Sequence, residues 1–228
     1  MIVLLDNQDS FVYNLVDALA GLPGLPGLSG LPGLPGQETV VYRNTVSAET
    51  VLGEIPGGAR PDLIVLSPGP GYPMNAGCMM EIIARAQGRI PILGICLGYQ
   101  ALVEHHGGQV VPCGPEHGVS LDMQLSPAGA ASPIFTGLTT DSVPGVPGWT
   151  VPVARYHSLG ATQEPGGMQA LAWAPTEIGD VIMAATTTDG MSIGLQFHPE
   201  SLLTPAGPAI LARCVEQLLK KGQHTHGN

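Results

Sequence analysis

A cysteine between two glycines follows an apolar run in "ILGICLGYQAL" (residues 92–102). A strand, a sharp turn and a helix would place Cys96 in the pattern G-x-nucleophile-x-G, where the glycines relieve crowding around the turn. The N-terminus of the following helix carries partial positive charge, which favours a thiolate. The backbone N–H of Leu97 would point to where an oxyanion forms. From this pentapeptide alone, a buried structural cysteine is an equally good interpretation.

A thiolate nucleophile requires a histidine, and the histidine requires a third group to orient it. His198 is the best candidate, because "GLQFHPES" (194–201) ends an apolar run and Pro199 stops the strand. Glu200 follows two residues after His198, and residues i and i+2 of an extended segment point to the same side. Taken alone, "HPE" is typical of an ordinary strand exit. Together with the turn at Cys96, it predicts a Cys96–His198–Glu200 triad.

A Gly-Pro loop, "LSPGPGYP" (66–73), directly follows another predicted strand. Its glycines allow bare backbone to approach a ligand, and its prolines stiffen the loop. Ligands of open α/β sheets bind at the carboxyl ends of the strands, where this loop would lie. The alternative is a tight turn without a binding role.

The first half of the chain alternates apolar runs with helical patterns, which predicts an α/β fold with a mostly parallel central sheet flanked by helices. The second half is rich in closely spaced strand-like segments, which predicts an antiparallel extension of that sheet. A last helix should begin near Thr204-Pro205, with Thr204 as N-cap, and run to about Lys221. We expect a single domain over 1–221 and a tail over 222–228. The expected strands of the first half are 2–5, 39–42, 62–66 and 90–95, the helices are 10–20, 47–55 and 78–87, and the strands of the second half are 108–113, 117–125, 150–158, 168–174, 180–186 and 191–197.

The segment "GLPGLPGLSGLPGLPG" (21–36) interrupts this pattern with Gly-X-Y triplets. A collagen triple helix requires three chains and many more triplets, so we interpret the segment as a low-complexity insert of extended, polyproline-like character. No functional role follows from its sequence.

Composition narrows the classes of partner. The net charge of −10 and the sequence pI of about 4.9 argue against nucleic acid and anionic membrane surfaces. No apolar stretch approaches the length of a membrane span, and "MIVLLD" is too short for a signal peptide. The four cysteines lack metal-site or disulfide-framework spacing, which favours a reducing, cytoplasmic setting and no metal site. Charged residues make up only 11% of the chain, so part of its surface is expected to be covered by another subunit.

Taken in order, "PGPG", "GICLGYQ" and "FHPES" resemble the class I (triad) glutamine amidotransferases. The segments "LLDNQDSFVYNL", "VVYRN", "ARYHSL" and "LTPAG" resemble, more narrowly, the glutaminase subunits of anthranilate synthase and aminodeoxychorismate synthase. The resemblance covers nearly the whole chain except 21–36, 142–149 and the tail. It implies a chain that hydrolyses L-glutamine to glutamate and ammonia.

The resemblance also implies residue roles. Cys96 would attack the side-chain amide of glutamine, His198 would act as general base and then acid, and Glu200 would orient His198. The N–H groups of Leu97 and Gly69 would form the oxyanion hole. Glutamine would be bound by Gly69, Pro70, Gly71, Leu97, Gln100, Ser158 and Leu159.

Ammonia would pass to a chorismate-using synthase subunit in a heterodimer or heterotetramer, for tryptophan synthesis, for folate synthesis or for both. No cofactor is expected in this chain, and magnesium would belong to the synthase. Relatives usually have lysine after His117-Gly118, where this chain has Val119, so its regulation by the partner could differ.

The residues by themselves leave two other classes of protein open. An α/β hydrolase with a cysteine nucleophile would act on esters or lactones, but that fold orders its triad nucleophile, acid, histidine. Here the acid, Glu200, follows the histidine. A non-catalytic regulatory subunit of the same fold is the other alternative, and the presence of all three triad residues argues against it.

Overall fold

The structure is a computed structural model that describes residues 1–10, 12–22, 38–116 and 118–225. Its main feature is a nine-stranded sheet in the order β2-β1-β3-β4-β11-β10-β9-β6-β7. Its strands are β1 (Ile2–Asp6), β2 (Thr39–Arg43), β3 (Leu63–Leu66), β4 (Ile92–Ile95), β6 (Val119–Leu125), β7 (Thr150–Arg155), β9 (Met168–Thr176), β10 (Gly179–Thr187) and β11 (Ser192–Leu195). Two short strands, β5 (Val111–Pro112) and β8 (Leu159–Gly160), pair separately.

Strands β2, β1, β3, β4 and β11 run parallel to one another, and the pairs from β11 through β10, β9 and β6 to β7 are antiparallel. The predicted parallel core with an antiparallel extension is therefore confirmed. The expectation was wrong in one respect, because 191–197 was assigned to the extension. Strand β11 lies between the two parts and pairs in parallel with β4, so the chain leaves both strands at the same edge of the sheet.

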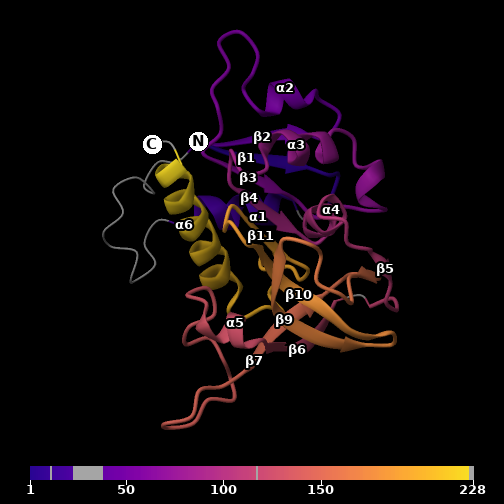
Figure 1. Cartoon of the computed structure of the whole chain (residues 1–228), viewed down its shortest axis with the longest axis vertical. Helices are drawn as coiled ribbons and strands as arrows, with labels where there is room; N and C mark the ends of the chain where they lie inside the picture. Colours follow the sequence, from indigo (N-terminus) through magenta and orange to yellow (C-terminus); the bar gives the residue numbers. More distant parts are fainter. Residues whose placement is uncertain (11, 23–37, 117, 226–228) are drawn as a thin grey trace.

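Helices cover both faces of the parallel strands, which explains why β3, β4 and β11 are buried along their whole length (Figure 1). One buried cluster joins α1 and α6 to one face, and a second joins α2, α3 and α4 to the other. The helices are α1 (Val12–Ala20), α2 (Ala48–Val51), α3 (Met79–Ala86), α4 (Leu97–His105), α5 (Pro127–Ala131), α6 (Gly207–Thr225) and a short 3₁₀ helix, η1 (Pro73–Asn75). Among the described residues, no helix is long and apolar enough to cross a membrane.

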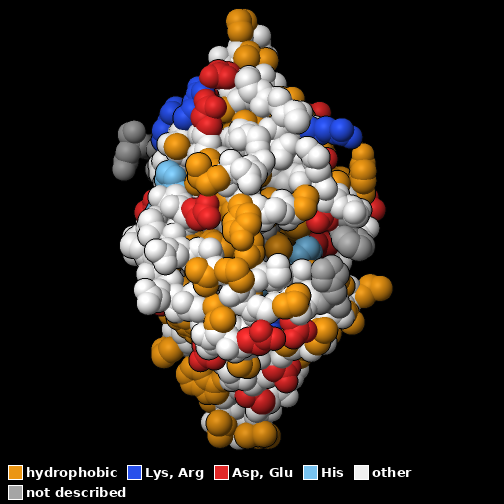
Figure 2. Space-filling model, turned by 90° about the vertical axis from the view of Figure 1, so that its right-hand side faces the viewer, with side chains coloured by type: hydrophobic (Ala, Val, Ile, Leu, Met, Phe, Trp, Pro, Cys, Tyr) orange, Lys and Arg blue, Asp and Glu red, His pale blue; other side chains and the backbone are white. Residues whose placement is uncertain are grey.

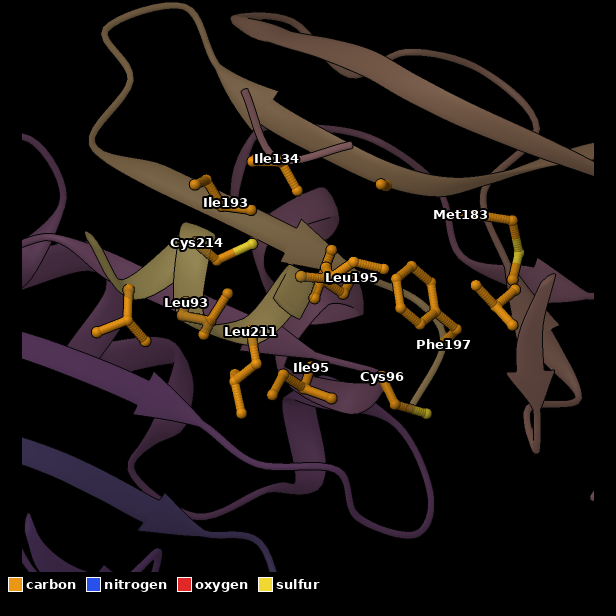
Figure 3. Close-up of a cluster of buried hydrophobic side chains, with 14 of the residues drawn as sticks. Leu93, Ile95, Cys96, Ile134, Met183, Ile193, Leu195, Phe197, Leu211 and Cys214 are labelled. Atoms are coloured by element: carbon orange, nitrogen blue, oxygen red, sulfur yellow. The ribbon is translucent and has the colours of Figure 1, made fainter. Parts of the chain in front are cut away.

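The cluster under α6 extends to the end of β4, where Cys96 follows Ile95. Leu93, Ile95 and Cys96 belong to it together with Phe197, which follows β11. Figure 3 shows Cys96 at the edge of this cluster, beyond Ile95. Cys96 therefore packs against buried apolar side chains on one side and lies at the edge of the sheet where β4 ends.

Local expectations hold in part. The helices expected over 10–20 and 78–87 are present as α1 and α3, whereas only Ala48–Val51 of 47–55 is helical. The last helix begins at Gly207 rather than near Thr204, and it continues to Thr225, past the expected end at Lys221. Nearly all of the insert expected over 21–36 lies outside the described residues.

Candidate active site

Cys96 occupies the turn between β4 and α4 in a strained backbone conformation, with φ 50° and ψ −102°. Among the described residues, only Gln8 and Cys96 are non-glycine residues with positive φ. The flanking glycines are required by close approach. A Cβ atom on Gly94 would lie 2.6 Å from the Gly98 carbonyl oxygen, and one on Gly98 would lie 2.4 Å from the Leu66 carbonyl oxygen. Strand β4, helix α4 and strand β3 thus hold Cys96 rigidly at the edge of the sheet.

His198 reaches the same edge because β11 pairs in parallel with β4, so that Leu195 is opposite Ile95. The backbone N–H of Cys96 donates to the Leu195 carbonyl at 2.7 Å, which joins the two strand ends. Nδ1 of His198 lies 2.7 Å from Oε1 of Glu200, and only 7% and 3% of the two side chains are exposed. The carboxylate therefore fixes the ring orientation and places the proton on Nδ1.

The charge of His198 is set by opposing effects. Burial acts to lower its pKa, but hydrogen bonding and charge interaction with Cys96 and Glu200 outweigh burial and raise the pKa of His198 to about 10. His198 is therefore an imidazolium at neutral pH, and a positive ring beside Glu200 can stabilise negative charge that develops in the site.

Two further side chains hold His198 in place. The hydroxyl of Thr204 donates to the His198 carbonyl at 2.8 Å and accepts from the Ala154 N–H at 2.9 Å. The ring of Tyr156 lies 5.0 Å from the ring of His198, centroid to centroid. Thr204 was expected to cap the last helix. It instead ties the segment after β11 to β7, because its hydroxyl is used before α6 begins.

A cavity of about 550 Å³ opens over Cys96 and His198. Its lining brings together most of the residues that the sequence singled out, namely Gly69, Pro70, Gly71, Cys96, Gln100, Ser158, Leu159 and His198. Leu97 is buried and Glu200 lies behind His198, so neither lines the cavity. The other lining residues lie in segments quoted from the sequence, but no role was expected for them individually: Gln8, Asp9, Ser10, Pro68, Tyr156 and His157.

The Gly-Pro loop forms one wall of this cavity. A Cβ atom on Gly69 would lie 2.6 Å from the Asn7 carbonyl oxygen and 2.9 Å from Cδ2 of Leu97, so the loop packs against the start of α4. Asn7 anchors the start of the loop. Its backbone N–H donates to Oγ of Ser67, and its side-chain amide donates to the Ser67 carbonyl, each at 2.9 Å. Gly71 has φ 81°, a left-handed conformation that suits glycine. These contacts position loop backbone beside the turn that holds Cys96.

Another part of the lining comes from the segment after β7. The side-chain amide of Gln100 donates to the Leu159 carbonyl at 3.1 Å, and the Ser158 carbonyl accepts from the Cys113 N–H at 2.8 Å. Ser158 itself is exposed. The first turn of α4 is therefore hydrogen-bonded to the 158–159 backbone, which lines the same cavity as the Gly-Pro loop.

His157 is a buried lining residue whose chemistry differs from that of His198. Burial and the charge of Arg155 lower the pKa of His157 to about 4, so the ring is neutral at pH 7. A neutral ring with Nδ1 2.8 Å from the Leu159 carbonyl must carry its proton on Nδ1 and donate it. His157 thus supports the 158–159 backbone. Its position in a strand-like segment concealed this role in the sequence.

No group of three or more His, Cys, Asp and Glu side chains is placed to share a metal ion in the described part of the chain. The four cysteines are free thiols. At the cavity, the structure brings together the thiol of Cys96 and the imidazole of His198, with the carboxylate of Glu200 bonded to that imidazole.

Comparison with known proteins agrees with this description. The family "Glutamine amidotransferase class-I" matches residues 3–218, so the chain belongs to the class I glutamine amidotransferases. This membership excludes the α/β-hydrolase alternative. The chain is 58% identical to anthranilate synthase component 2 of Corynebacterium glutamicum, over 96% of this chain and 98% of that protein.

More distant relatives carry related names. Anthranilate synthase component 2 of Vibrio parahaemolyticus is 36% identical, over 96% of this chain and 97% of that protein. A Pseudomonas aeruginosa protein, "Anthranilate synthase component 2, pyocyanine specific", is 40% identical, over 92% of this chain and 90% of that protein. Among solved structures, a protein from Thermoplasma acidophilum described as part of a GMP synthase superposes with a TM-score of 0.72 at 21% identity, covering 99% of this chain and 96% of that one. This last likeness concerns the fold alone.

Proposed function

We propose that this chain is the glutamine-hydrolysing subunit of an anthranilate synthase, and that it supplies ammonia to a synthase subunit that aminates chorismate. The observation that carries the proposal is the convergence of Cys96, His198 and Glu200 at the edge of one cavity. The 58% identity to a component 2 over nearly its full length supports the choice of synthase.

The proposed reaction begins when the Cys96 thiolate attacks the side-chain carbonyl carbon of glutamine. The N–H groups of Leu97 and Gly69 stabilise the negative charge on the carbonyl oxygen. His198 donates a proton to the departing nitrogen, so ammonia leaves and a glutamyl thioester remains on Cys96. His198 then removes a proton from water, which attacks the thioester. Glutamate is released and the sulfur is free again.

We assign glutamine binding to the two walls of the cavity. The 69–71 backbone and the 158–159 backbone provide N–H and carbonyl groups, and Gln100 provides a side-chain amide. These groups are held by contacts within the chain, such as those of Asn7 and His157. Backbone held in this way loses little entropy on binding, which suits a small polar substrate.

The surface beside the site supports a protein partner. Leu202 lies two residues after Glu200 and is 98% exposed, and Met74, shortly after the Gly-Pro loop, is 69% exposed. Hydrophobic side chains are spread over the face in Figure 2, and Lys and Arg are found mainly toward its upper end. A partner that covers these loops would also contact the segments that carry His198 and Gly69. It could therefore change their positions relative to Cys96.

The test is the glutaminase rate of the chain against added synthase, with and without chorismate. We expect weak activity alone and a rise of at least about tenfold with substrate-bound synthase, which requires coupling of only about 1.4 kcal/mol. Leu202→Ser should weaken the complex and the activation, whereas Ile178→Ser should not, although Ile178 is also exposed (45%). Full activity of the isolated chain, unchanged by synthase, would contradict the coupling.

The identity of the synthase is tested in the same assay. We expect anthranilate as the product, and formation of aminodeoxychorismate with a different synthase would assign the chain to folate synthesis or to both pathways. A synthase that binds the chain and responds to chorismate without any glutamine hydrolysis would favour a non-catalytic regulatory subunit.

A further inference from the structure

A fully buried amide, that of Gln196, lies beside the sulfur of Cys96. In the parallel pairing of β4 with β11, Ile95 is opposite Leu195, so the next residues, Cys96 and Gln196, leave the two strands side by side. Gln196 is 0% exposed, and its Nε2 lies 3.8 Å from Sγ of Cys96. This distance lies within the range for hydrogen bonds to sulfur, which is larger than oxygen.

The network around Gln196 determines which end of its amide faces the sulfur. The side-chain amide of Gln100 donates to Oε1 of Gln196 at 3.3 Å and to the Leu159 carbonyl at 3.1 Å. Because Nε2 of Gln100 is a donor, the group that it contacts on Gln196 must be the carbonyl oxygen. The NH₂ group of Gln196 is therefore directed at Cys96.

A donor in this position distinguishes the two forms of the sulfur. A thiolate is a charged acceptor, and hydrogen bonds to charged groups are roughly twice as strong as those between neutral groups. A buried NH₂ group that loses its partner carries a desolvation cost, which adds to this preference. The amide cannot titrate, so it remains a donor at every pH.

We propose that Gln196 stabilises the thiolate of Cys96 through its NH₂ group, and that Gln100 links this contact to the wall of the cavity that binds substrate. The inference rests on the proposed role of Cys96 as nucleophile. Substrate that contacts Gln100 and the 158–159 backbone would tighten the chain of hydrogen bonds from the Leu159 carbonyl to Sγ of Cys96. Binding and activation of the nucleophile would then be coupled through side chains alone.

The experiment measures the alkylation rate of Cys96 by iodoacetamide against pH, with each cysteine-containing peptide quantified by mass spectrometry. Gln196→Met keeps the volume and removes the donor, and Gln196→Glu keeps the shape and places an acceptor opposite the sulfur. The matched control is Ser192→Ala, which removes a part-buried side-chain hydrogen bond (to Gln87, 3.2 Å) at the start of β11, the strand that precedes Gln196. The native charged and titratable groups near Cys96 are kept in all three variants: His198 and Glu200 after β11, His157 after β7 and Asp9 after β1. Gln196→Glu adds a carboxyl group of its own, so Gln196→Met is the variant that isolates the loss of the donor.

We expect the pH midpoint of alkylation to rise by about one unit in Gln196→Met and by more in Gln196→Glu, which corresponds to a loss of about tenfold in thiolate at a fixed lower pH. The midpoint of Ser192→Ala should match the wild type. The value of kcat/KM for glutamine should fall at least about tenfold in both Gln196 variants. Gln196→Glu provides the measurement if Gln196→Met does not fold.

An unchanged midpoint in a folded Gln196 variant would overturn the inference, as would an equal shift in Ser192→Ala. Failure of the proposed function has a different signature, because then either the wild-type chain would not hydrolyse glutamine or a Cys96→Ala chain would still do so. The two outcomes are therefore separable in the same set of proteins.

Discussion

Replacement of Gly98 by alanine tests how closely the turn at Cys96 depends on packing. The added Cβ atom would lie 2.4 Å from the carbonyl oxygen and 2.6 Å from Cβ of Leu66. Non-bonded carbon atoms normally lie at least about 3.5 Å apart, so α4 must move away from β3 by about 1 Å. Cys96 lies immediately before α4 and would move with it. A displacement of about 1 Å near reacting groups can cost a hundredfold in rate.

We therefore expect Gly98→Ala to lower kcat/KM for glutamine by about a hundredfold, measured with saturating synthase and chorismate. Overpacking of this kind costs about 1–3 kcal/mol, which for a domain of this size lowers Tm by roughly 2–12 °C. The variant should therefore remain folded at 25 °C. Ammonia-dependent anthranilate synthesis by the same complex should be unchanged, because the displaced thiol is not used in that reaction.

Gly166→Ala is the matched control, since the nearest heavy atom to a Cβ atom there is the His106 carbonyl oxygen at 3.8 Å. Its rate should stay within about twofold of the wild type. A Gly98→Ala chain that hydrolyses glutamine at the wild-type rate would refute the reasoning, since the close approach of α4 to β3 would then have no bearing on Cys96.

Two further predictions concern charge. Glu200→Gln keeps a hydrogen-bond acceptor for Nδ1 of His198 but removes a charge that raises the pKa of His198. The basic limb of the kcat/KM profile should therefore move to lower pH by at least about one unit. A basic limb at the wild-type pH would show that Glu200 does not raise the pKa of His198. His157→Asn concerns stability. The folded pKa of His157 is lowered to about 4, so the unfolded chain binds more protons below about pH 6.5, and stability should fall by about 1.4 kcal/mol per pH unit from there toward pH 4. His157→Asn, which cannot titrate, should flatten this part of the Tm-against-pH curve, and a slope equal to that of the wild type would contradict the assignment.

Features that depend on nearby residues were predictable from the sequence. The alternation of apolar runs and helical patterns predicted the parallel half of the sheet, and the two glycines around Cys96 predicted the turn. The spacing of His198 and Glu200 predicted their contact, which is present at 2.7 Å. Gln196 precedes His198 by two residues, so the same alternation places the Gln196 side chain on the side of His198 and Glu200. The sequence therefore contained a signal for Gln196.

Features that depend on distant residues were not predictable. The apolar pattern of β11 is compatible with parallel or antiparallel partners, and only the fold places it beside β4. Thr204 before proline is typical of a helix N-cap, but its hydroxyl contacts His198 and Ala154 instead. Helix α6 begins at Gly207, where a Cβ atom would lie 1.9 Å from the Pro199 carbonyl oxygen. These contacts join segments that no local pattern relates.

The central claim is that attack by the Cys96 thiolate releases the amide nitrogen of glutamine as ammonia, which a separate synthase then uses. The most direct measurement compares anthranilate formation from glutamine and from ammonium ions in complexes of the synthase with wild-type chain and with Cys96→Ala. We predict that the variant complex forms anthranilate from ammonium ions at close to the wild-type rate and forms none from glutamine. A Cys96→Ala complex that still uses glutamine at a rate near that of the wild type would contradict the account.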